Sequence, residues 1–460
     1  MKTALIWLRR SLRLKSNMVI SKALEQCDKI KICFLFDEKI LSYFPDRADR
    51  RLSFIANHIE MMNRELAQFG SSVEVLYGNP NEQIPKFAKE NNINVVFCDM
   101  DFEPSSIIRD NEVEKILREV KIDFIPVLDH LLIHPSELLK QDGTPFKVFT
   151  PYMKLFRSRA GDQTLRVPSY DLHGRTTPSE CIFSNKEMLK RAGYEYIEDP
   201  IWHPKKADES FRKFVRSKLP FYHLRRNLLS GDHTSSISPY LRFGALSIRE
   251  VFSISLENEV AESYVNELIW REFYAYILFH FPYSASSEFQ EKYKGKITWR
   301  HDPVLFEAFC AGLTGYPVVD AAIRQLLQTG WMHNRARMIV ASFFTKNLFM
   351  DWREGEKFFA RYLMDYDLAS NAGGWQWTAS TGTDAQPYFR VFNPINQGKD
   401  HDPDGEYVKK YVPELSGVKI SDIHDPETIM EKYYVKNYPR PIVDYKKTRE
   451  NAIKAFQEVV

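Results

Sequence analysis

Four short segments in the second half of the chain concentrate the side chains that could do chemistry. The first is the hydroxyl-rich run from Gly231 to Pro239, which reads GDHTSSISP. Several hydroxyl and main-chain donors close together are what a phosphate-binding turn requires. Ser and Thr are equally common where a helix begins, because their side chains cap its first amides. Taken alone, the run favours a capped helix start.

The second segment, NELIWREFY, runs from Asn266 to Tyr274. On a helix, Glu267, Trp270 and Arg271 are three or four residues apart and share one face. A carboxylate, an indole and a guanidinium on one face could line a polar pocket. They could also form a surface Glu267–Arg271 pair beside a core Trp, and the local pattern favours this structural interpretation.

The third and fourth segments combine charged side chains with glycines and aromatic residues. The third includes Thr314–Asp320 and then Gly330–Met338, where Arg335 and Arg337 next to Asn334 could hold a phosphate. Ordinary salt bridges within a helix are the alternative, and the local pattern favours them. The fourth, residues 365–384, lacks the periodicity of a helix or a strand, which predicts a loop; the local pattern favours a loop that builds a site and a purely structural loop about equally.

The elements that must position these segments differ between the two halves of the chain. Short apolar runs alternate with amphipathic ones over the first 130 residues, which predicts a Rossmann-like parallel α/β sheet. Prolines interrupt residues 131–200, which predicts a connector. Helical periodicity dominates residues 201–460, so a large all-α domain is expected there. The predicted strands are Thr3–Leu8, Ile30–Phe36, Val73–Tyr77, Val95–Cys98 and Phe124–Val127, and the clearest predicted helices are Arg51–Phe69, Asn111–Val120, Val251–Leu256, Val265–Phe281, Val304–Phe309, Val318–Leu327 and Arg335–Phe349.

Composition excludes several classes of protein. The 460 residues carry a formal net charge of only +2, so any nucleic-acid site must be a local patch. The five cysteines include no CxxC pair, which argues against a metal site or a disulfide framework. No stretch has the length of a membrane span or a signal-peptide core. We therefore expect a cytoplasmic protein with no membrane partner.

Taken together, the four segments resemble the DNA photolyase/cryptochrome family, and within it the class I cyclobutane pyrimidine dimer photolyases. The resemblance covers nearly the whole chain in the same order. It also includes Ile6–Leu14, Lys147–Pro151, Asp351–Glu356 and Pro387–Pro394. It implies an all-α domain that binds FAD and an enzyme of the deoxyribodipyrimidine photo-lyase type.

The resemblance assigns a role to each position that matches the family pattern. The FAD-binding residues would be Tyr222, Thr234, Ser235, Ser236, Ile237, Ser238, Arg271, Asn334, Arg337, Asp365, Asp367 and Asn371, the last facing the redox-active nitrogen. Tyr264 is a modest departure, because the family often has Trp there. UV-damaged DNA would be contacted by Arg226, Glu267, Trp270, Arg335, Met338, Trp377 and Arg390, with Glu267 on the carbonyl edges of the dimer. Trp375, Trp352 and Trp299 match the family's electron-hopping chain.

Relatives with the same fold remain as alternatives. A (6-4) photolyase carries histidines at the positions of Asn334 and Met338, and neither is histidine here. A cryptochrome, a blue-light receptor, often has a long C-terminal extension, whereas this chain ends 66 residues after Pro394. A DASH-type protein fits the opening residues and the flavin site less well than class I does.

A second, antenna chromophore is also implied. Folate-binding members place a Lys near Ala285 and Ser286, where this chain has none. Asp101–Pro104 and Arg51 resemble the deazaflavin-binding type, so a deazaflavin or FMN is favoured, with folate or no antenna left open. Asp101 and Glu103 would otherwise end a strand on a solvated loop. The family expectation is a monomer.

Overall fold

The computed structural model describes residues 1–179, 183–258 and 260–459, and it divides into two compact units. Unit 1 comprises Met1–Pro145, Tyr152–Pro220 and Ser235–Glu272. Unit 2 comprises Phe146–Pro151, Phe221–Thr234 and Phe273–Val460. Helices α6 (Phe149–Arg159) and α13 (Glu262–His280) each contribute residues to both units. The predicted boundaries near residues 130 and 200 stay a prediction.

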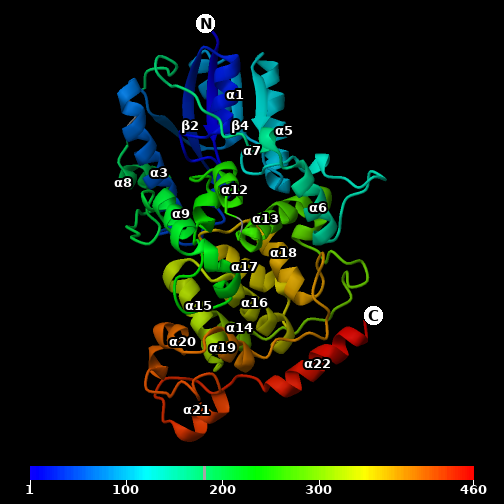
Figure 1. Ribbon diagram of the computed structural model, residues 1–460. Helices are drawn as coiled ribbons and strands as arrows, with labels where there is room; N and C mark the ends of the chain where they lie inside the picture. The colour runs from blue at the N-terminus through cyan, green and yellow to red at the C-terminus, as the bar shows by residue number, and fades with distance from the viewer. Residues whose placement is uncertain (180–182, 259, 460) are drawn as a thin grey trace. The chain divides into compact units, whose positions relative to one another are not determined.

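Unit 1 contains a five-stranded parallel sheet, as predicted for the first part of the chain (Figure 1). Its strand order is β3-β2-β1-β4-β5. All five predicted strands are confirmed, with ends shifted by at most one residue. Alternate residues of β1 enter two separate cores, Ile6 on one face and Trp7 on the other. Apolar burial on both faces explains why these strands are continuous apolar runs. The strands are β1 Thr3–Leu8, β2 Lys29–Asp37, β3 Val73–Gly78, β4 Val95–Asp99 and β5 Asp123–Val127.

Helices cover both faces of this sheet. Residues of α1 and α3 belong to the core that contains Ile6, and residues of α4 and α5 belong to the core that contains Trp7. The α5 helix begins at Pro104, seven residues before the predicted start, because proline is well suited to a first helical turn. The other helices that lie within unit 1 are α1 Met18–Gln26, α2 Glu38–Leu41, α3 Arg50–Leu66, α4 Pro80–Glu90, α5 Pro104–Glu119, α7 Asp162–Leu165, α8 Asn185–Arg191, α9 Lys206–Ser217, α11 Ser238–Arg242 and α12 Ile248–Leu256.

The described residues of unit 2 form helices joined by loops, with no strand among them, which confirms the predicted fold class. Its core is formed chiefly by α15, α16, α17, α18 and α20, and it includes buried Trp352 and Trp375. Its helices are α10 Tyr222–Arg225, α14 Pro303–Cys310, α15 Pro317–Thr329, α16 Asn334–Ser342, α17 Trp352–Tyr362, α18 Leu368–Ala379, α19 Pro394–His401, α20 Glu406–Tyr411, α21 Pro426–Lys432 and α22 Tyr445–Gln457.

Two helical segments differ from the sequence expectation. Residues 365–384 were expected to be a loop, but residues 368–379 form α18, in which Gly373 allows close packing against another element. A Cβ on Gly373 would lie 2.2 Å from the Tyr274 ring, so the contact itself requires glycine. The predicted helix 335–349 is α16 followed by a π-helical turn, Phe343–Asn347. Such turns are frequent near functional sites.

Candidate functional site

The part of α13 that belongs to unit 1 carries three of the predicted site residues. Glu267, Trp270 and Arg271 are each half-buried and lie on one side of the helix. The Arg271 guanidinium donates to the carbonyl oxygen of His130 at 2.7 Å and lies 3.6 Å from the Glu272 carboxylate. Burial raises the pKa of Glu272 to about 7. The helix therefore presents a carboxylate and an indole beside a guanidinium held by the main chain.

The hydroxyl-rich run forms a tight turn before α11. Ser236 adopts a positive φ of 51°, which is uncommon for a residue other than glycine. The helix does begin at Ser238, but the N-cap residue is Ile237 and it makes no side-chain cap bond. The predicted helix start is therefore present, but the prediction that a hydroxyl side chain caps it is wrong. Ser235 instead accepts a hydrogen bond from the Tyr264 hydroxyl at 3.0 Å.

The two arginines at the start of α16 make contacts far away in the sequence. Arg335 donates to the side-chain oxygen of Asn227 at 2.9 Å, next in the chain to Arg226. Arg337 donates to the carbonyl oxygen of Met332 at 2.9 Å and to Asp365 Oδ2 at 2.7 Å. The local pattern favoured salt bridges within the helix. The contacts of Arg335 and Arg337 instead join α16 to the segments before α11 and α18.

Asp365 has one oxygen engaged and one available. Its Oδ2 accepts from Arg337, while its buried Oδ1 has no hydrogen-bond partner among the described residues. A buried polar atom without a partner costs free energy unless a ligand supplies one. Two residues later, Asp367 caps α18 by accepting from the Ser370 amide at 3.0 Å. The start of α18 thus leaves an acceptor suited to an N–H or O–H group.

The side-chain amide of Asn371 has a fixed orientation. Its nitrogen donates to the main-chain oxygen of Glu356 at 3.1 Å and to the Glu356 carboxylate at 2.9 Å. The Tyr366 hydroxyl donates to the same carboxylate at 3.1 Å. Burial raises the pKa of Glu356, and these two donors partly offset that effect. With its nitrogen engaged, Asn371 can offer only its amide oxygen to a ligand.

The three tryptophans of the predicted electron-hopping chain have different surroundings. Trp375 and Trp352 are buried, and neither indole N–H has a partner among the described residues. Trp375 packs against the Phe359 ring at 4.9 Å, and the helices α17 and α18 pack together. Trp299 is half-buried and lies 5.2 Å from the Phe349 ring. Buried indoles usually donate a hydrogen bond, so the two unpartnered ones are unusual.

The remaining predicted site residues of unit 2 range from exposed to buried. Asn334 is exposed, and its amide nitrogen lies 3.9 Å from the Met338 sulfur one turn along α16. Trp377 is half-buried and Arg390 is exposed. Tyr222 is buried with the Arg226 guanidinium 5.7 Å from its ring centre. Thr234 ends a stretch of unit 2, while Ser235–Ser238 belong to unit 1.

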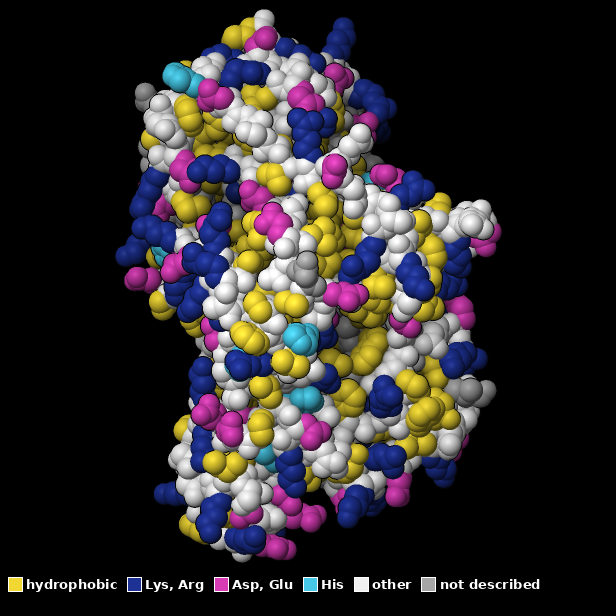
Figure 2. Space-filling view, viewed as in Figure 1, with side chains coloured by type: hydrophobic (Ala, Val, Ile, Leu, Met, Phe, Trp, Pro, Cys, Tyr) yellow, Lys and Arg dark blue, Asp and Glu magenta, His cyan; other side chains and the backbone are white. Residues whose placement is uncertain are grey.

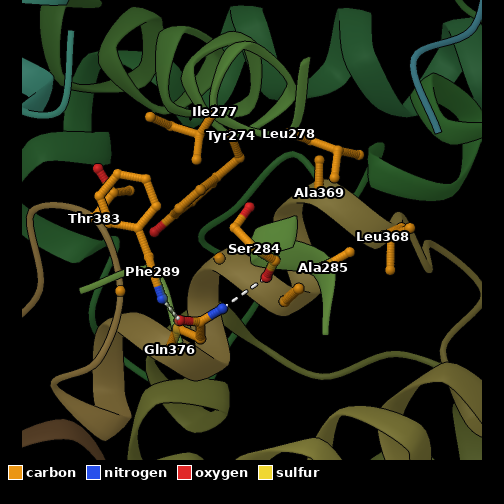
Figure 3. A pocket seen from close by; sticks show the side chains of 13 residues that line it. Tyr274, Ile277, Leu278, Ser284, Ala285, Phe289, Leu368, Ala369, Gln376 and Thr383 are labelled. Carbon is orange, nitrogen blue, oxygen red and sulfur yellow. Dashed lines mark hydrogen bonds between the residues drawn. The ribbon is translucent and has the colours of Figure 1, made fainter. Parts of the chain in front are cut away.

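A small apolar pocket lies on another face of α18 (Figure 3). Its wall includes Tyr274 and Ile277 of α13, and Gln376 of α18 closes one side. The Gln376 amide donates to the Ser284 carbonyl at 2.7 Å and accepts from the Phe289 amide at 2.8 Å. None of the predicted site residues lines this pocket. Ala285, which bears on the antenna question, does line it.

The residues that favoured a deazaflavin antenna are engaged within unit 1. Asp101 accepts from its neighbouring amides at Phe102 and Glu103, at 2.8 and 3.2 Å. Although burial alone would raise the pKa of Asp101, the Arg10 guanidinium holds it well below its usual range. Arg51 pairs with Asp49 at 2.7 Å. The expected alternative of a solvated loop is wrong for Asp101, which is nearly buried. The antenna's identity stays a prediction.

Comparisons with known proteins agree on one family. A model of the FAD binding domain of DNA photolyase matches residues 264–458, and a DNA photolyase model matches residues 4–169. A deoxyribodipyrimidine photo-lyase from Alkalihalophilus pseudofirmus is 36% identical over 476 aligned residues, which cover 98% of this chain and 97% of that protein. The chain belongs to the DNA photolyase family. The expected family and enzyme type are thereby confirmed, and the class I assignment stays a prediction.

Solved photolyase structures have the same fold. A bacterial class III photolyase from Agrobacterium tumefaciens aligns with a TM-score of 0.87 and 29% identity, covering 100% of this chain and 98% of that one. An archaeal photolyase from Sulfolobus tokodaii, described with two FAD molecules and a novel light-harvesting cofactor, aligns with a TM-score of 0.86 and 30% identity. That alignment covers 99% of this chain and 100% of the archaeal one.

The residues of unit 2 fit the FAD that the photolyase family binds. The unpartnered Asp365 Oδ1 is an acceptor for a ring N–H or a sugar hydroxyl. The amide oxygen of Asn371 is a second acceptor, and Arg337 supplies positive charge beside Asp365. This donor and acceptor set suits a flavin, whose ring carries both kinds of group. The expected FAD cofactor is confirmed by the family model.

Two further absences concern other kinds of site. No helix among the described residues is both long and apolar enough to cross a membrane. Within the same residues, no cluster of three or more His, Cys, Asp and Glu side chains could hold a metal ion.

Sequence reasoning missed two residues that position the predicted photolyase site. Glu356 orients Asn371, and Asn227 orients Arg335. Glu356 lies in the segment Asp351–Glu356 that carries the family resemblance, which was the only available signal. Asn227 had none, because it lies 108 residues from Arg335 in the sequence.

Proposed function

We propose that this protein is a photolyase that repairs cyclobutane pyrimidine dimers with light. The observation that carries the proposal is the Asn334–Met338 contact at the start of α16. An amide and a thioether stand where a (6-4) photolyase has two histidines, and neither can act as a general acid. Splitting a cyclobutane breaks two carbon–carbon bonds and needs no net proton transfer. This pair therefore suits the dimer.

The adjacent histidine supports the same choice of lesion. His333 is buried, and its Nδ1 accepts from the Arg335 amide at 3.1 Å. Burial and the neighbouring Arg337 lower the pKa of His333 to about 4, so it is neutral near pH 7. A neutral, capping imidazole is not a proton donor for a bound base. The α16 terminus thus offers contacts to a lesion without offering it an acid.

The proposed dimer pocket uses indoles and one carboxyl group. A dimer must leave the duplex to reach a buried cofactor, and damaged bases unstack easily. Trp270 and Trp377 would form apolar walls around the flipped bases, and Glu267 would hydrogen-bond their polar edges. Arg226, Arg335 and Arg390 would contact phosphates without reading sequence. The Asn227 contact holds the Arg335 guanidinium ready for this role.

Bound FAD supplies light absorption and, when reduced, an electron donor. This chain would hold it through Asp365, Arg337 and the turn from Thr234 to Ser238, with Asn371 turning its amide oxygen toward the redox-active nitrogen. Arg271, Asn334, Asp367 and Tyr222 are the other proposed contacts. Glu356 fixes the Asn371 amide by a charge-assisted hydrogen bond, so the orientation does not depend on the cofactor.

Trp375, Trp352 and Trp299 would carry electrons from the surface to the cofactor. Because the N–H groups of Trp375 and Trp352 have no acceptor among the described residues, an oxidised indole there would keep its proton. The positive hole would then stay mobile and move toward the half-buried Trp299. As second chromophore we propose a deazaflavin or FMN. Extraction of the purified protein and mass spectrometry would identify it, and folate or no second chromophore would contradict this proposal.

The function is tested by direct repair. The reduced protein is given blue light with an oligonucleotide that holds one cyclobutane thymine dimer, and separately with one (6-4) product, with dark controls. We expect light-dependent repair of the first alone. Glu267→Ala should lower its quantum yield severalfold, while Glu262→Ala, an exposed carboxylate on the same helix, should not. Repair of the (6-4) product alone would overturn the proposal. Photoreducible FAD with no repair would indicate a blue-light receptor.

A further inference from the structure

The C-terminal residues concentrate positive charge that the rest of the chain does not have. Residues 436–454 contain six basic and two acidic side chains, a formal charge of +4, whereas the whole chain carries +2. We define the basic strip as the six exposed cations of these residues. They are Lys436, Arg440, Lys446, Lys447, Arg449 and Lys454. A local excess of this size produces a field that the net charge conceals.

Three arginines on other surface helices are each paired with a carboxylate one turn away. Arg118 of α5 pairs with Glu114, Arg191 of α8 with Glu187, and Arg212 of α9 with Asp208. The cations of the basic strip form no ion pair within the described part of the chain, although Glu450 lies among them. The strip is therefore a run of uncompensated charge, unlike those three arginines.

Packing holds α22 in place. Ala452 and Phe456 are buried, whereas Lys446, Lys447, Arg449 and Lys454 are exposed. The Phe456 ring lies 3.6 Å from the buried Lys346 ammonium and 6.2 Å from the Trp299 ring. Asp444 caps the helix by accepting from the Lys447 amide at 3.1 Å. In Figure 2, dark blue side chains are visible at the lower right, where Figure 1 places α22.

The segment before α22 is fixed as well. The Ile442 amide donates to the Thr314 carbonyl at 3.0 Å, and the Tyr316 hydroxyl donates to the Val443 carbonyl at 2.8 Å. The Tyr438 hydroxyl donates to the buried carboxylate of Asp320 at 2.8 Å. These bonds hold the strip at defined positions, so a partner would not have to order it on binding.

We propose that the basic strip binds the phosphate backbone of duplex DNA outside the damaged nucleotides. This inference rests on the proposed function, since it adds a second contact region to the same substrate. A polyanion is the natural complement of closely spaced, unpaired cations, and such binding ignores sequence. An anionic membrane suits the strip less well, because α22 has no exposed large apolar side chain to insert. The strip would raise affinity for long DNA in general.

The test compares the salt dependence of binding to undamaged duplex DNA in the dark. The variant is Lys446→Gln/Lys447→Gln/Arg449→Gln, measured by fluorescence anisotropy on a 40-base-pair probe between 50 and 200 mM salt. Each phosphate contact contributes about 0.9 to the slope of log affinity against log salt, so three lost contacts reduce it by about 2.7. Between 50 and 200 mM salt, the factor by which affinity falls should be about 40 times smaller for the variant than for the wild type.

The matched control is Arg118→Gln/Arg191→Gln/Arg212→Gln, which removes the same charge from paired positions. We expect the slope of the control to change by less than about 0.5. The control loses the same net charge as the first variant but none of the proposed phosphate contacts, and salt screens the effect of net charge alone. Equal slopes for the two variants, or no change in either, would overturn the proposal. The proposal would also be overturned if the first variant lost binding to phosphatidylserine vesicles while the salt dependence of its DNA binding stayed unchanged. The binding assay uses no light and no lesion. A failure of dimer repair would therefore not change the interpretation of the salt dependence.

Discussion

The buried contact between Tyr438 and Asp320 gives a prediction whose size depends on pH. Asp320 is fully buried and accepts four hydrogen bonds, from the Thr314 amide and hydroxyl, the Gly315 amide and the Tyr438 hydroxyl. Burial raises the pKa of this carboxyl group from 3.8 to about 6, although the four donors oppose the rise. Tyr438→Phe removes one donor and leaves the ring in place.

The expected loss of stability follows from the charge state of Asp320. Above pH 6 the acceptor is ionised, and a hydrogen bond to a charged group contributes about 1.5–3 kcal/mol. Below pH 5 the carboxyl group is largely protonated, and a neutral bond contributes about 0.5–1.5 kcal/mol. Because the lost donor favoured the ionised form, the variant should have an even higher Asp320 pKa. Its destabilisation should therefore grow as pH rises from 5 to 7.5.

In the wild type, the contribution of Asp320 to the free energy of folding should also become less favourable as pH rises. A carboxyl group whose folded-state pKa is raised binds protons more tightly when folded. Its contribution therefore disfavours folding increasingly as pH rises from about 4 to about 6. Tyr438→Phe should extend that decline to higher pH.

Urea unfolding at pH 5 and pH 7.5 measures both effects, and amide hydrogen exchange of residues 438–457 shows whether the C-terminal segment opens first. Tyr433→Phe is the matched control, because the Tyr433 hydroxyl bonds to Asp422 near the surface at 2.9 Å. We expect it to cost less than about 0.5 kcal/mol at either pH. Equal losses for the two variants, or a Tyr438→Phe loss that shrinks toward pH 7.5, would refute the reasoning.

Three further predictions concern the environment of α18. Gly355→Ala places a Cβ 2.2 Å from the Trp375 ring and should destabilise by about 1–3 kcal/mol in thermal unfolding, whereas Gly374→Ala, with nothing within 4 Å, should not destabilise. Asp365→Asn weakens the pair with Arg337 and should raise the Kd for FAD at least tenfold in fluorescence titration; an unchanged Kd would contradict this role. Trp375→Phe should abolish light-driven flavin reduction while chemically reduced protein still repairs dimers, and equal loss of both would contradict the hopping role.

The parts of the fold that could be predicted are those that depend on neighbouring residues in the sequence. The five strands were predicted because continuous apolar runs bounded by polar residues need no knowledge of distant partners. The helix α18 was missed because its sequence has weak periodicity and its Gly373 is explained only by a distant contact. Gly373 lies against Tyr274, and Gly355 of α17 lies against Trp375. Tertiary packing decided what the local propensity left open.

The site divides in the same way. The sequence by itself determined the residue types, the family they resemble and the spacing of Glu267, Trp270 and Arg271 on one helix. Only the tertiary structure decided that Arg337 meets Asp365, that Glu356 orients Asn371, and that the cations of α22 are unpaired. Such contacts join residues far apart in the chain, and their geometry depends on how whole helices pack. A pattern of neighbours along the sequence carries no record of that packing.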